Sequence, residues 1–112
     1  MQHLESLGEI TVAQSTPIRV LHRRAAMVRN KTVSDMQTEL LSDHFFTLRM
    51  TTSAGAYVKE FVHGDLGRTV PSIGSLLHCQ ADILQLDVLG IDDDKLKATE
   101  NSTQEVVAEM AD

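Results

Sequence analysis

Residues 45–67 constrain the fold more than any other part of this sequence, because a strand pattern passes into a helix pattern through a short turn. Phe46, Leu48 and Met50 fall on one face of a β-strand, and the residues between them fall on the other. Small residues at 53–55 then favour a tight turn. A helix is predicted over 56–66 from an apolar stripe of Val58, Phe61, Val62 and Leu66, with Gly67 at its C-terminal end.

The rest of the chain favours an α+β fold with an antiparallel sheet of mixed strand lengths and this one main helix on a face. Counting the strand already described, strands are predicted at 18–22, 26–41, 44–51 and 73–90. The broken alternation within 26–41 indicates a β-bulge. Leu84, Leu86 and Val88 alternate with polar residues, as in a half-buried strand, and Gly74 argues against a helix at the start of that segment.

Two units are expected, residues 1–91 as the folded part and residues 92–112 as a disordered acidic tail. Of the net charge of −6, most falls from residue 92 onward, where seven acidic residues stand against two lysines. Apolar residues thin out there, as in chains that do not fold alone. Gln104–Met110 is the one stretch of the tail with a weak helical pattern.

Several classes of protein are disfavoured by the composition. A single cysteine, Cys79, excludes an internal disulfide and a multi-cysteine metal site. The five histidines are scattered without ligand spacing, so no metal site is expected. No apolar run reaches the roughly 20 residues of a membrane span, so no membrane partner is expected. An intracellular location is expected, with nucleus and cytoplasm both open.

A basic segment without any acidic residue runs from 18 to 31. One interpretation is an exposed, charged connection. The other is contact with RNA phosphates, because arginine guanidinium groups match phosphate oxygens and such contacts position RNA. The candidate RNA-binding residues are Arg19, His22, Arg23, Arg24 and Arg29.

Lys59 stands in the first turn of the predicted helix, where the helix dipole favours anions rather than a cation. It is either a solvated surface lysine or a group held there to meet a carboxylate or a phosphate. Tyr57 either packs against the helix or shapes a pocket. Glu60 is interpreted as solvated surface.

Residues 54–69 read Ala-Gly-Ala-Tyr-Val-Lys-Glu-Phe-Val-His-Gly-Asp-Leu-Gly-Arg-Thr. This segment resembles the Gly-Thr-Tyr-Ile-Arg/Lys motif of pseudouridine synthases. The likeness is strongest to the tRNA pseudouridine synthases of archaea and eukaryotes that act on the T-arm. Residues 16–24, 71–77 and 81–88 continue it in the same order. The resemblance covers roughly residues 7 to 92 and corresponds to the C-terminal part of the family's catalytic domain.

This resemblance implies that residues 1–91 form part of a pseudouridine synthase catalytic fold and act without metal or organic cofactor. Lys59 stands at the position of the Arg or Lys that stabilises the catalytic aspartate. Tyr57 matches the tyrosine of the same motif, and Leu76 aligns best with a leucine that packs against the site. The implied partners are tRNA or other structured RNA, and the N-terminal part of the same enzyme.

The sequence departs from the family by an absence, since no stretch resembles the motif that carries the catalytic aspartate. The leading hypothesis is therefore a C-terminal fragment or truncated relative of an isomerase that converts uridine to pseudouridine in tRNA, inactive alone. The alternative is a non-catalytic RNA-binding or interaction module. A third hypothesis is a small acidic adaptor that shares only the fold.

Overall fold

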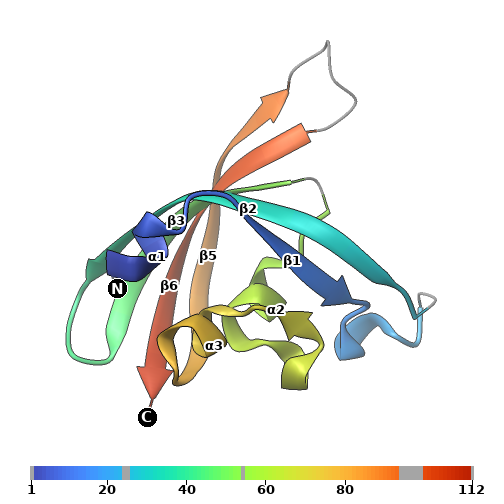
Figure 1. Cartoon of the computed structure of the whole chain (residues 1–112), viewed down its shortest axis with the longest axis horizontal. Coiled ribbons are helices and arrows are strands. Elements are labelled where there is room, and N and C mark those ends of the chain that lie inside the picture. The colour runs from blue at the N-terminus through green and yellow to red at the C-terminus, as the bar shows by residue number, and fades with distance from the viewer. Residues whose placement is uncertain (1, 24–25, 54, 94–99, 112) are drawn as a thin grey trace.

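A computed structural model describes residues 2–23, 26–53, 55–93 and 100–111 (Figure 1). These residues form a six-stranded sheet in the order β4-β1-β2-β3-β6-β5, with short helices on one side. The elements in chain order are α1 (Gln2–Ser6), β1 (Ile10–Ser15), the 3₁₀ turn η1 (Ile18–Val20), β2 (Val28–Leu40), β3 (Phe45–Ser53), α2 (Val58–His63), the 3₁₀ turn η2 (Asp65–Gly67), β4 (Thr69–Val70), α3 (Ile73–Leu77), β5 (Gln80–Asp93) and β6 (Glu100–Ala111).

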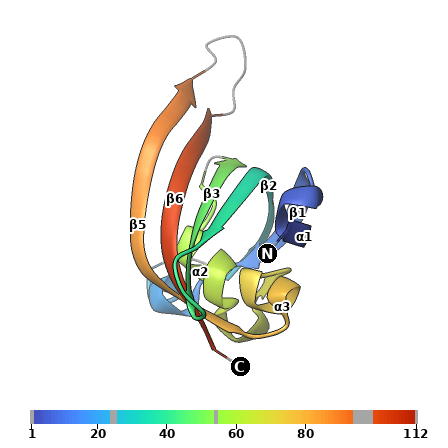
Figure 2. The same ribbon diagram turned by 90° about the vertical axis from the view of Figure 1, so that its left-hand side faces the viewer.

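The sheet curls around α2 and α3, so that a single apolar core lies between the strands and these two helices (Figure 2). The five strand pairings are all antiparallel. The α+β class with an antiparallel sheet and a helix on one face is therefore confirmed. None of the helices in the described ranges is long and apolar enough to cross a membrane.

The hairpin of β2 and β3 agrees with its prediction. Phe46, Leu48 and Met50 are fully buried, and the residues between them face outward. The expected bulge lies between Ser34 and Gln37, where the pairing register shifts. Each strand keeps one face on the core, so the alternation of apolar and polar residues within the strand was enough to predict it.

The helix predicted at 56–66 is shorter than expected. It spans Val58–His63. Gly64, rather than Gly67, caps its C-terminus in the left-handed conformation, with a φ of 87°. Val58, Phe61 and Val62 are buried as predicted. Leu66 was wrongly placed in the stripe, because it lies in η2 beyond the cap and is 92% exposed.

The predicted strand at 18–22 is wrong, because residues 18–20 form the turn η1 after Pro17. The strand of this region is β1, one segment earlier. The predicted strand at 73–90 begins only at Gln80, since residues 73–77 form α3. Ser72 and Ser75 cap α3 reciprocally. Gly74 is required there because a β-carbon would approach the Cys79 carbonyl oxygen to 2.8 Å.

The predicted disordered tail is also wrong, because residues 100–111 form β6, which lies between β3 and β5. Residues 94–99 of that predicted tail lie outside the described residues. Gln104, Val106 and Ala108 alternate into the core, while Glu105 and Glu109 point to the other face. Acidic residues on that outward face gave the segment its disordered composition.

The adjacent residues Val106 and Val107 provide a direct test of β6. Val106 is fully buried, whereas Val107 lies half-buried on the other face opposite Thr47. We predict that V106A lowers the free energy of unfolding by about 2 kcal/mol, through lost apolar burial and the cavity left behind. V107A should lower it by less than about half as much. Equal, negligible losses in urea denaturation would instead support a disordered tail.

Candidate functional site

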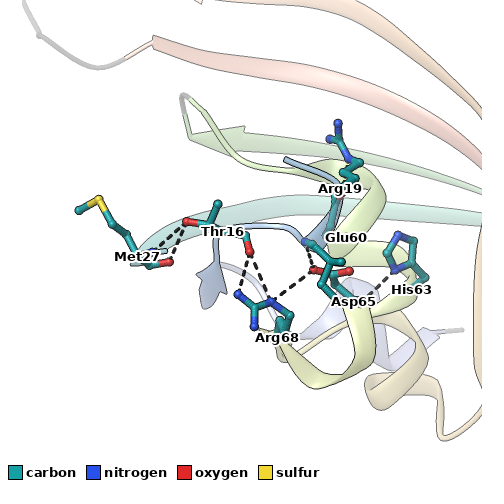
Figure 3. A network of polar contacts seen from close by, with 8 residues as sticks. Thr16, Arg19, Met27, Glu60, His63, Asp65 and Arg68 are labelled. Carbon is teal, nitrogen blue, oxygen red and sulfur yellow. Dashed lines mark hydrogen bonds and ion pairs between the residues drawn. The ribbon is translucent and has the colours of Figure 1, made fainter. Parts of the chain in front are cut away.

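The segment from Thr16 to Arg19 docks on α2 and on the residues around η2, which brings two distant parts of the sequence together (Figure 3). The backbone N–H of Ile18 donates to Asp65 Oδ2 at 3.0 Å. Arg68 donates from Nη2 to the carbonyl oxygen of Thr16 at 2.9 Å and lies 3.7 Å from Asp65. Asp65 and Arg68 thereby hold the start of the basic segment in place.

Arg19 and Glu60 form the ion pair with the most buried carboxylate of this network. Arg19 Nε lies 2.5 Å from Glu60 Oε1, and the Glu60 side chain is only 2% exposed, whereas that of Arg19 is 54% exposed. The earlier interpretation of Glu60 as solvated surface is therefore wrong. The hydrogen bond to Glu60, partly opposed by burial, raises the pKa of the Arg19 guanidinium, which stays cationic.

Tyr57 stands immediately before α2 and is held by its backbone. Gln14 of β1, itself buried, accepts from Tyr57 N at 2.9 Å and donates from Nε2 to Tyr57 O at 2.8 Å. The half-buried ring lies under Arg19, whose guanidinium carbon is 5.8 Å from the ring centroid. This distance is within the range of a cation–π contact. Gln14 therefore fixes where the tyrosine sits relative to Arg19.

Lys59 and the remaining basic candidates are surface groups. Lys59 is exposed in the first turn of α2, and His22 and Arg23 are exposed after η1. Arg29 is exposed on β2, where Nη2 donates to Met27 Sδ at 3.4 Å. Arg24 lies outside the described residues.

Leu76 was expected on a strand and lies on α3, half-buried against the core. Leu76 therefore packs on the core from a helix rather than from the predicted strand.

Lys31 approaches the same site from β2, although sequence reasoning gave it no role. A β-carbon on Gly55, whose φ is +77°, would lie 3.2 Å from Lys31 Nζ. The turn before Tyr57 therefore passes directly beside an ammonium group. Sequence reasoning also missed Glu60 and Gln14, since only the nonlocal docking of β1 and η1 buries them. The one sequence signal that pointed towards Glu60 is the acid-free basic segment 18–31, whose arginines need acidic partners from another part of the chain.

A groove of about 850 Å³ lies elsewhere, between η2, β4, α3 and the ends of β5 and β6. Asp65, Asp82 and Glu109 are among its lining residues, and no arginine or lysine in the described part of the chain lines it. Phosphate groups are repelled by such a lining. The charge of the groove therefore differs from that of the surface around Arg19, Tyr57 and Lys59. Among the described residues, no group of three or more potential metal ligands converges.

Comparison with known proteins gives matches over most of the chain. The family model described as Pus10, C-terminal, matches residues 1–92. The protein named tRNA pseudouridine synthase Pus10 from Xenopus laevis is 52% identical over 94 residues, covering 84% of this chain and 18% of the relative. Its human namesake is 48% identical, with the same coverage. The namesake from Pyrococcus furiosus is 44% identical over 91 residues, covering 81% of this chain and 24% of the relative. The chain thus spans about a fifth of the length of these relatives.

The contribution of the Arg19–Glu60 pair to stability can be measured against that of a second, more exposed arginine–glutamate pair. R19A leaves the Glu60 carboxylate buried without its partner, so we predict a loss of about 2 kcal/mol in the free energy of unfolding, reduced from a fully buried case because Arg19 is half-exposed. R49A breaks the exposed pair of Arg49 with Glu105, at 3.2 Å, and should cost less than about 1 kcal/mol. Urea denaturation measures both, and equal losses would contradict a special cost for Glu60.

Proposed function

The chain belongs to the Pus10 C-terminal family, and on that basis we propose that it supplies part of an RNA-binding catalytic site that isomerises uridine to pseudouridine in tRNA. The relatives carry the name tRNA pseudouridine synthase. This chain corresponds to about a fifth of their length, so the activity of the whole protein is part of the proposal.

One observation carries the proposal, namely that two of the four segments that resemble this family, 16–24 and 54–69, meet at a single place. The Ile18–Asp65 hydrogen bond and the Arg19–Glu60 ion pair join them. The result is a surface on which Arg19, Tyr57 and Lys59 lie at or beside one helix start. Cations next to an aromatic ring are suited to RNA, because they neutralise phosphates and the ring can stack on a base.

Lys59 is proposed to stabilise an ionised aspartate that another part of the longer protein supplies. The resemblance implies an aspartate that must stay ionised in a site closed over a base, and a neighbouring cation favours the charged form. An exposed lysine in the first turn of α2 is free to meet such a group from outside the described fold. Tyr57 is proposed to line the base pocket, and Leu76 to support it through the core.

We expect the chain alone to form no pseudouridine in an unmodified tRNA transcript, because Lys59, Tyr57 and Leu76 can support an aspartate but not replace one. Asp65 is engaged by Ile18 and Arg68, and Asp82 and Asp87 lie exposed on β5. Chemical mapping of pseudouridine measures the outcome. Turnover that disappears when Asp65, Asp82 or Asp87 is replaced by alanine would place the catalytic residue within this chain.

The role of Lys59 can be tested in a hybrid in which this segment replaces the matching region of the Xenopus laevis relative. K59M should raise the activation barrier by about 2–4 kcal/mol, or roughly 30- to 1,000-fold in rate, by analogy with loss of one preorganised charge partner. Stability should change by less than about 1 kcal/mol, since the side chain is exposed. K59R should keep most of the activity. Normal turnover by K59M, with the unmutated hybrid as control, would contradict this role.

A further inference from the structure

Burying the Glu60 carboxylate at this position destabilises the fold. Its side chain is 2% exposed, and Oε2 is buried without a hydrogen-bond partner among the described residues. When one oxygen of a buried carboxylate has no partner, the lost hydration free energy exceeds the free energy gained from a single ion pair. An apolar residue here would cost the fold less, so stability alone does not explain Glu60.

The geometry of the pair suggests what Glu60 does. It binds Arg19 from the side, at Nε. The two terminal nitrogens of the guanidinium have no partner within the described part of the chain, and the Arg19 side chain is half-exposed. In Figure 3 the side chain extends away from the Asp65–Arg68 pair. The guanidinium is also held over the Tyr57 ring at 5.8 Å.

We propose that Glu60 is a positioning residue that orients Arg19 over Tyr57, with the end of the guanidinium fork presented to an RNA phosphate. A free arginine loses considerable rotamer entropy when it binds a phosphate. An arginine already fixed at Nε has lost part of that freedom, and its two terminal nitrogens still match two phosphate oxygens. The inference rests on the proposed function and assigns Glu60 the task of prearranging one of its RNA contacts.

The direction in which RNA affinity changes when Glu60 is replaced distinguishes a positioning role from a purely electrostatic one. Replacing Glu60 by glutamine removes one negative charge, which on electrostatic grounds alone strengthens RNA binding. Positioning predicts the opposite result, because the amide oxygen of glutamine accepts from Arg19 Nε more weakly than a carboxylate does. E105Q is the matched control, because it removes the same charge from the exposed Arg49–Glu105 pair on the other face of the sheet.

The first measurement is binding of the chain to an unmodified tRNA transcript across a salt series. E60Q and R19A should each weaken binding, on the order of three- to tenfold, and reduce the log–log salt slope by about one. E105Q should bind as well as the original chain or better. In the R19A background, E60Q should no longer weaken binding, because the positioning effect of Glu60 acts only through Arg19.

The second measurement needs no RNA. Tyr57 is the only tyrosine and there is no tryptophan, so intrinsic fluorescence reports on this ring alone. Acrylamide should quench Tyr57 more strongly in E60Q and in R19A than in the original chain, whereas E105Q should leave quenching unchanged. All variants are compared at a temperature where circular dichroism shows them folded.

The two measurements distinguish the possible failures. Unchanged quenching in E60Q, or tRNA binding by E60Q that equals or exceeds that of the original chain while R19A binds weakly, overturns the positioning role. An original chain with no salt-dependent tRNA binding overturns the proposed function and the RNA part of this inference. The fluorescence result then decides whether Glu60 orients Arg19.

Discussion

The docking of residues 16–20 onto the end of α2 is the contact on which the rest of the candidate site depends. Proline at position 17 has no N–H to place, and the next N–H, that of Ile18, is taken up by Asp65. Arg68 satisfies the carbonyl oxygen of Thr16. With both groups satisfied, the chain turns as η1 and carries Arg19 to Glu60. These contacts join residues that are 41 to 52 positions apart, so the site exists only in the folded chain.

A strained turn makes this docking possible. From Gly64 to Gly67 each residue has a positive φ, including 48° at Asp65 and 56° at Leu66, where no glycine relieves the crowding. Such conformations cost about 1–2 kcal/mol for each residue that is not glycine. Hydrogen bonds across the turn, from Gly67 and Thr69 to the carbonyl oxygen of Gly64, offset part of that cost. The turn sets Asp65 and Arg68 against the basic segment and leaves Leu66 in solvent.

The sequence predicted the elements whose signal is local and missed those that depend on distant neighbours. The β2–β3 hairpin, its bulge and the buried residues of α2 follow from periodicity within each element. By contrast, β6 has acidic residues on its outward face, and only the flanking strands β3 and β5 show that its other face is core. Gly74 argued against a helix, yet the fold requires it in α3 because the Cys79 carbonyl oxygen lies so close. In the same way, motif resemblance singled out Tyr57 and Lys59 as candidates, whereas Glu60 and Gln14 are placed beside them only by contacts with residues far away in the sequence.

The central claim is that the two motif segments form one RNA-facing surface around Tyr57. Amide chemical-shift mapping of the labelled chain, titrated with an unmodified tRNA transcript, tests it most directly. The largest shifts are expected at Arg19, Tyr57 and Lys59 and in the exposed residues that follow η1. Residues of the acidic groove, such as Asp82 and Glu109, should shift little. Shifts concentrated in that groove or on the outer face of β5, with Arg19 and Tyr57 unchanged, would contradict the account.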